Sequence, residues 1–140
     1  MAYHNQQVVC SIPLGMGTPG AAGTFLVPVL GLPGTSQYGG GITITKVWYS
    51  TNKAVASGSA PTAELISLTS TGGTVAIVCT ALSSAAWTAG TPVLGTLVAG
   101  KEFVPGTVSY IGVKIGHDLL TSQDTCLNVG IMYVSGRADK

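Results

Sequence analysis

Short segments in which apolar and polar residues alternate dominate the chain, as is typical of strands with one buried face. The clearest of these in the first half covers residues 42–50, where Ile42, Ile44 and Trp48 fall on one face and Lys46 interrupts it. No window shows the 3.6-residue apolar repeat of an amphipathic helix, and only residues 83–88 suit a short helical turn. The pattern therefore predicts an all-β chain.

Glycines and prolines divide the chain into about eight such segments. The predicted strands cover residues 7–14, 24–30, 42–50, 63–69, 74–82, 92–99, 107–115 and 125–134. The last two have the strongest patterns and are predicted to be central strands. Residues 75–79 are almost continuously apolar, which predicts burial on both faces. Pro28 predicts that its strand lies at a sheet edge or contains a bulge.

Short strands at intervals of about 8–12 residues, separated by Gly/Pro turns, predict a single antiparallel β-sandwich or jelly-roll-like barrel. A length of 140 residues suits one domain. We expect residues 1–7 to form a flexible polar N-terminal arm, residues 8–135 the β-sandwich domain, and residues 136–140 a C-terminal tail.

Charged residues are scarce, because they make up 8% of the chain while apolar residues make up 46%. Soluble proteins average about 25% charged residues. The surface must therefore consist largely of hydroxyl, amide and small side chains, which cost less to desolvate than charges do. This composition favours a surface that becomes buried in an assembly. The alternative is a secreted or low-charge β domain that stays soluble through its hydroxyl groups.

Several partners and compartments are excluded by the same sequence. The six basic residues are scattered singly, so no stripe exists that would neutralise nucleic-acid phosphates. The longest apolar stretch, residues 21–32, is too short for a membrane span and contains Pro28. The chain opens without a basic, apolar secretory signal, and its three cysteines are widely spaced, so we expect folding in a reducing cytoplasm.

Motifs that would carry chemistry are incomplete. Residues 15–20 match the Gly-x-Gly-x-x-Gly dinucleotide fingerprint, but no helix pattern follows and no acidic residue occurs before Glu64, which favours a plain glycine loop. His117 beside Asp118 lacks a third partner, which favours a solvated polar turn. The His and Cys residues lack metal-ligand spacing. We expect no catalytic, cofactor or metal site, and hence no enzyme.

Residues 94–111 read Leu-Gly-Thr-Leu-Val-Ala-Gly-Lys-Glu-Phe-Val-Pro-Gly-Thr-Val-Ser-Tyr-Ile, which resembles the β-sandwich modules of tailed-phage particles. Together with the uncharged arm and the Ala/Gly/Thr/Val-rich body, the chain is similar to capsid decoration (cement) proteins of tailed bacteriophages. The resemblance implies a non-enzymatic virion structural protein, made in the host cytoplasm and located on the capsid surface. It further implies that the protein binds the major capsid protein, stabilises the shell and forms a homotrimer.

In this interpretation, the arm orders on a neighbouring subunit, because polar termini stay mobile until they are tied down. The candidate assembly contacts are Tyr3, His4, Asn5, Gln6 and Gln7. An alternative function is a carbohydrate- or receptor-binding β-sandwich module of a phage fibre, with Trp48 and Trp87 as the residues that stack on the ligand. A third is an enzyme with an unrecognised site, which would require His117 to lie near a distant acid or cysteine.

Overall fold

The structure is a computed structural model that describes residues 6–13, 22–32, 40–54, 62–80, 88–118 and 126–136; side chains are described for all of these except residues 22–25, 117 and 118. This part of the chain contains no helix. Its strands are β1 (Gln6–Pro13), β2 (Ala22–Gly31), β3 (Gly41–Thr51), β4 (Thr62–Leu68), β5 (Thr74–Cys79), β6 (Val93–Leu94), β7 (Phe103–Pro105), β8 (Tyr110–Asp118) and β9 (Cys126–Ser135). The all-β prediction is confirmed.

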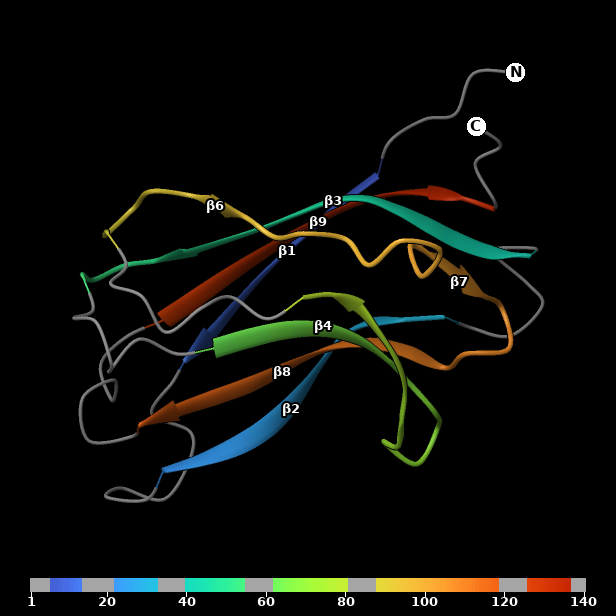
Figure 1. Cartoon of the computed structure of the whole chain (residues 1–140), viewed down its shortest axis with the longest axis horizontal. Helices are drawn as coiled ribbons and strands as arrows, with labels where there is room; N and C mark the ends of the chain where they lie inside the picture. The colour runs from blue at the N-terminus through green and yellow to red at the C-terminus, as the bar shows by residue number, and fades with distance from the viewer. Residues whose placement is uncertain are drawn as a thin grey trace.

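The strands form two antiparallel sheets that lie one above the other (Figure 1). Sheet A has the order β1-β9-β3-β6, and β7 also pairs with β3. Sheet B has the order β2-β8-β4-β5. The predicted β-sandwich is therefore confirmed, with β8 and β9 in central positions as expected.

The pairing follows a ribbon that is folded back at the turn between β4 and β5. Moving outward from that turn, β4 pairs with β5, β3 with β6 and β7, β2 with β8, and β1 with β9. Successive pairs lie alternately in sheet B and sheet A. A double-stranded ribbon wound into two sheets in this way is the jelly-roll arrangement.

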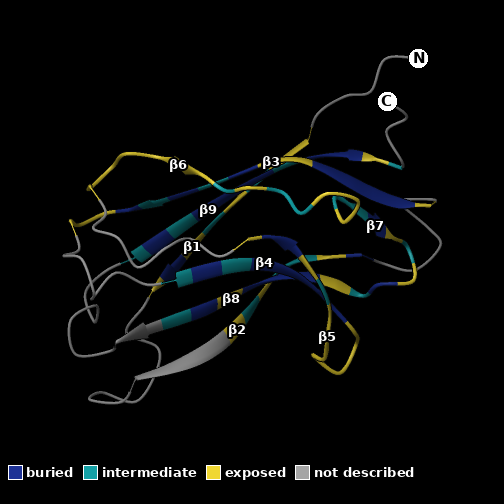
Figure 2. Cartoon of the chain, viewed as in Figure 1, coloured by how far each residue is buried: buried dark blue, intermediate teal, exposed yellow. Residues whose placement is uncertain are grey.

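Apolar side chains from both sheets meet in the space between them. The fully buried members include Ile12, Ile42, Ile44, Val47, Tyr49, Ala63, Leu65, Ile111, Val113, Ile115, Leu127, Val129 and Ile131. Burial is concentrated in the central strands β3, β4, β8 and β9, whereas β1, β5 and β6 carry more exposed residues (Figure 2). The inward face of β9 is the one that its alternating pattern predicts.

A β-bulge changes the faces of β3. The register against β9 shifts between Ile44 and Lys46, so Thr45 is an extra residue on the β3 side. Because side chains alternate with a period of two, one extra residue moves every later side chain to the opposite face. The prediction that Trp48 shares a face with Ile42 and Ile44 was therefore wrong.

Beyond the bulge, Val47 and Tyr49 face the core and are fully buried. Lys46 is exposed and Trp48 is half-buried. The bulge thus resolves the conflict in the sequence pattern, because it keeps the charge of Lys46 in solvent. It also transfers the largest aromatic side chain of β3 to the outer face of sheet A.

The apolar run of residues 75–79 is not buried on both faces as predicted. It belongs to β5, which ends sheet B, and its Val75 and Ile77 are exposed. The predicted strand 92–99 is also shorter, because only the two residues of β6 pair with β3. The chain then crosses to sheet B, where Leu97 forms a bridge with Cys79.

Other predictions concern turns and chain ends. β2 lies at the edge of sheet B and its register shifts after Pro28, as predicted. The backbone of His117 and Asp118 continues β8 rather than forming the predicted turn. The glycine motif of residues 15–20 and most of the predicted helical turn 83–88 lie outside the described residues.

Candidate interaction surface

A row of four residues crosses the outer face of sheet A. In the antiparallel register, Val9 lies opposite Gly130, Gly130 opposite Trp48, and Trp48 opposite Leu94. Residues directly opposite one another in a sheet share a face and contact their neighbours. We call Val9, Gly130, Trp48 and Leu94 the Trp48 row.

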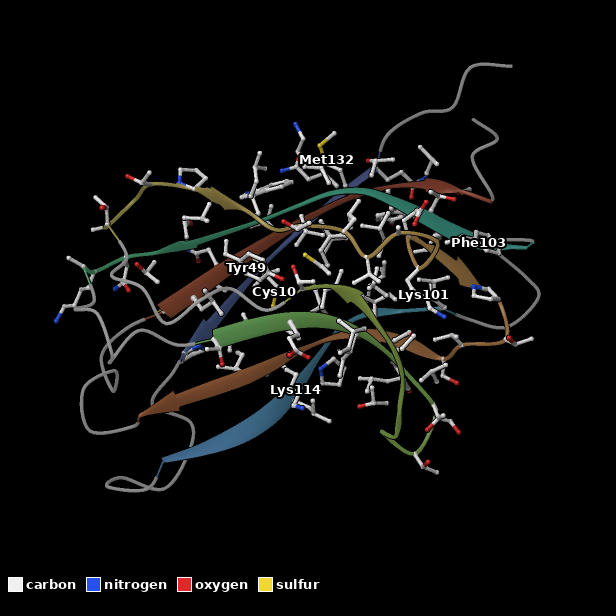
Figure 3. The ribbon with its side chains drawn as sticks, in the orientation of Figure 1. Cys10, Tyr49, Lys101, Phe103, Lys114 and Met132 are labelled. Atoms are coloured by element: carbon white, nitrogen blue, oxygen red, sulfur yellow. The ribbon has the colours of Figure 1, made fainter. Side chains whose placement is uncertain are left out.

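The outward direction of this row follows from the residues beside it. Val8 and Cys10, on either side of Val9, pack against the core, so Val9 points away from it. Tyr49, which follows Trp48, is fully buried. Figure 3 shows Tyr49 and Cys10 between the sheets and Met132, from the neighbouring row, on the opposite side of sheet A.

Gly130 makes room for the Trp48 side chain. A Cβ atom at position 130 would overlap with Cε2, Cζ2 and Nε1 of the Trp48 indole. The indole therefore covers the backbone of β9, and its partial burial depends on the missing side chain. The alternating sequence pattern did not single out Gly130, although a glycine inside a strand is a known signal of close approach by another group.

The two ends of the Trp48 row are the large apolar side chains with the greatest exposure in the described chain. Val9 is 60% exposed and Leu94 64% exposed. Met132 is half-buried beside them, and the charged neighbour is Lys46, opposite Met132. The outer face of an antiparallel sheet is usually polar when it meets water. An exposed apolar row on that face is therefore a candidate contact surface.

Inside the sandwich, Tyr49 lies beside Cys79, and both side chains border Gly95. A Cβ atom on Gly95 would overlap with Sγ of Cys79 and come within 3.1 Å of Cε2 of Tyr49. Burial, and next the nearby Cys79, raises the pKa of Tyr49 far above its usual range. The pKa of Cys79 is raised overall, because burial raises it more than the neighbouring Tyr49 lowers it. Because the thiolate is the nucleophilic form, Cys79 is a packing residue rather than a reactive thiol.

The predicted contact residues fall in different places. Gln6 and Gln7 are exposed residues of β1, opposite Tyr133 and Met132. Tyr3, His4 and Asn5 lie outside the described residues, as does Trp87. The structure therefore places Gln7 and Trp48, from two separate predictions, on the same outer face of sheet A.

The described part of the chain offers no group of three His, Cys, Asp or Glu side chains arranged to hold a metal ion. A cleft of about 360 Å³ lies between β5 and β7, and Lys101 is its only ionisable described lining residue. It thus brings together no acid–base pair. Within the same residues, no helix has the length and apolar character needed to cross a membrane.

The topology defines the protein as a jelly-roll β-sandwich, and its exposed apolar row defines a candidate contact surface on sheet A. No protein-family model matches the sequence, and no curated protein sequence matches it. Among solved structures, that of the infectious bursal disease virus Gx strain is similar to this chain, with a TM-score of 0.41 and 14% sequence identity. The match covers 99% of this chain and 32% of that chain, so this chain spans about a third of its length.

Proposed function

We propose that the protein is a non-enzymatic structural subunit of a virus particle, and specifically that it binds the outer surface of an assembled capsid and stabilises it. Its partners are then the major capsid protein and, as a homotrimer, further copies of itself. The finer assignment to the decoration proteins of tailed phages continues the resemblance in residues 94–111. The observation that carries the proposal is the exposed Trp48 row.

The jelly-roll fold is compatible with several functions and does not select one of them. Jelly rolls occur in viral capsid proteins and in lectins, among others, and a fold alone does not define a function. The surface favours an assembly role. Aromatic side chains, tryptophan above all, dominate the binding energy of protein interfaces, and charged side chains are depleted at interface centres. Trp48 between Val9 and Leu94, in a chain with 8% charged residues, matches both tendencies.

Stabilisation of a shell would follow from mass action. A subunit that binds the assembled shell, but not its separated parts, lowers the free energy of the assembled state in proportion to the number of occupied sites. This mechanism needs no catalytic group and no cofactor. It needs a rigid apolar contact, and the Trp48 row lies on the three longest strands of sheet A together with β6.

The first experiment is gradient sedimentation of particles from the native source, with detection of this chain in each fraction. We expect it to co-migrate with particles of viral size. Purified chain is then added to particles that lack it. Leu94→Lys should reduce binding at least about tenfold, because it buries an unpaired charge at the contact.

The matched control for that substitution is Val75→Lys. Val75 is 53% exposed and lies on β5 of sheet B, so it gives the same chemical change on the other sheet. Its binding should equal that of the unmodified chain. Recovery of the native chain as a small soluble species alone would overturn the proposal.

A second candidate function is binding of a carbohydrate or receptor by a fibre module. It is favoured by the half-buried indole of Trp48 on an outer sheet face, because sugar rings stack on such aromatic surfaces. A glycan-binding screen with the unmodified chain and with Trp48→Ala separates the two candidates. Glycan affinity that disappears with Trp48→Ala, in a chain that does not associate with particles, would favour this second function.

A further inference from the structure

The described strands leave four sheet edges, and three of them carry features that oppose pairing with another strand. On β2, Pro28 lacks an N–H group and the register shifts beside it. β6 and β7 contain only two and three residues. The outer edge of β5 is occupied near its end, where the N–H of Thr80 donates to the carbonyl of Thr96 and that of Val98 donates to the carbonyl of Val78. Short, bulged or covered edges are the usual protection against edge-to-edge association.

The edge formed by β1 has none of these features. Its eight residues pair with β9 without any register shift, and no described strand pairs with its other side. It contains no charged residue, and its proline is the last residue, Pro13. An edge strand of this length without charge, bulge or internal proline presents a row of free N–H and C=O groups that can accept another strand.

We propose that β1 pairs antiparallel with β1 of a second copy of this chain, about a twofold axis that passes midway between the two Val9 residues. Sheet A would then continue from one copy into the other. The proposal rests on the edge alone and does not depend on the role in a virus particle.

The sequence of β1 is compatible with its own reverse in this register. Val9 would lie opposite Val9 of the second copy, which shields two side chains that are 60% exposed in the single chain. Gln7 would lie opposite Ser11, and the two can form a hydrogen bond across the strands. Because no charge lies in β1, self-pairing brings no like charges together. A twofold contact requires this kind of self-complementarity.

The pairing would also join the two Trp48 rows. Each row runs from Leu94 through Trp48 and Gly130 to Val9, which is its end at the free edge. Two copies related by the twofold axis would present a single apolar row, twice as long, on one continuous outer face. The second copy thus shields Val9, the end of the row that lies at the free edge.

The test is sedimentation equilibrium of the purified chain over a concentration series, for the unmodified protein, Val9→Lys and Leu94→Lys. We expect dimers for the unmodified protein, or hexamers if homotrimers also form through other surfaces. Val9→Lys should raise the dissociation constant at least about tenfold, because two like charges would lie directly opposite. Leu94→Lys, at the other end of the row, should leave it unchanged. Equal unfolding temperatures would show that both variants fold.

Cross-linking gives a second readout of the register. Residues directly opposite in an antiparallel pair have Cβ atoms about 4.5–5.5 Å apart, so Val9→Cys should form a disulfide-linked dimer under mild oxidation. Leu94→Cys, of similar exposure, and the unmodified chain with its Cys10, Cys79 and Cys126 should not. An unmodified protein that stays monomeric at all concentrations, or a trimer whose mass Val9→Lys does not change, would overturn the proposal.

Discussion

Among individual residues, Gly130 affects the outer surface of sheet A directly. Its missing side chain determines how closely the Trp48 indole approaches β9. If the strands kept the same geometry, any larger residue at position 130 would force the indole away from the sheet. The shape of the candidate contact surface thus depends on a residue that has no side chain.

Replacing Gly130 with alanine should lower the free energy of unfolding by about 1–3 kcal/mol, because an added methyl group overlaps with packed atoms. Urea unfolding measures the effect. Gly31→Ala is the matched control, since its Cβ atom would meet only the Tyr110 ring at 3.9 Å. The double variant with Trp48→Ala should show less than the sum of the two single effects. Additive effects would contradict the contact.

Because of Tyr49, the stability of the folded protein should vary with pH in the alkaline range. Its hydroxyl has no hydrogen-bond partner among the described residues, although the nearby Cys79 contributes to raising its pKa. The folded state keeps the phenol protonated at a pH where the unfolded chain, with a pKa of about 10, releases the proton. The contribution of the protonated Tyr49 to the free energy of unfolding is therefore fully present below about pH 10, and it is lost as the pH rises further.

Above about pH 10, the free energy of unfolding should fall by up to about 1.4 kcal/mol per pH unit for this one proton. Tyr49→Phe should remove that slope, and it should be as stable as the unmodified protein or more so near pH 7, because it deletes an unsatisfied buried hydroxyl. Denaturant unfolding at a series of pH values tests both points. Identical alkaline slopes for the two proteins would refute the assignment.

Among the strands, β3 shows how a single bulge controls two surfaces. The extra residue Thr45 keeps Lys46 in solvent, and it places Val47 in the core and Trp48 outside. The side-chain hydroxyl of Thr45 donates a hydrogen bond to the carbonyl of Met132 on β9, which ties the bulge to the neighbouring strand. Without the bulge, the core would lose Val47 and Tyr49 and would receive a lysine.

The bulge predicts that substitutions at two neighbouring positions change the stability by very different amounts. Val47→Ala should cost roughly 2–3 kcal/mol, because it opens a cavity in the core. Lys46→Ala should change the stability by less than about 0.5 kcal/mol, since the side chain is exposed. Thermal unfolding of both variants checks the assignment. A small effect of Val47→Ala would indicate that the regular alternation holds through residue 47.

At the scale of the whole molecule, the wound ribbon brings the first and the last described strands into one pair. β1 and β9 are adjacent in sheet A, with Gln6 opposite Tyr133 and Pro13 opposite Cys126 (Figure 1). Their sheet also carries the Trp48 row, so the free edge and the apolar row belong to the same side of the molecule. The candidate contacts are therefore concentrated on sheet A.

Contact through such a surface should depend only weakly on ionic strength. The charged group that flanks the Trp48 row is Lys46, and salt screens attraction between exposed charges but not apolar burial. We expect the affinity for particles to change less than about threefold between low salt and about 0.5 M salt. A tenfold or greater loss over that range would show that charges carry the binding.

Much of the fold could be predicted from local patterns. Alternating apolar residues in β9 and the glycine and proline turns indicated short strands in a sandwich, because the period of two and the turn residues are properties of a few neighbouring positions. The edge position of β2 followed from Pro28 for the same reason. The low charge favours a surface that becomes buried in an assembly, and this prediction depends on composition alone.

The remaining features depend on partners far along the chain. Whether Trp48 faces the core or solvent depends on the register of β3 against β9. Val75 and Ile77 of β5 are exposed, whereas Val78 and Cys79 are buried, in a strand that ends sheet B among the described residues. Gly130 acquires its role only when Trp48 lies opposite. Pairing register and sheet order arise from long-range packing, and local sequence therefore predicted the strands but not the surfaces that they present.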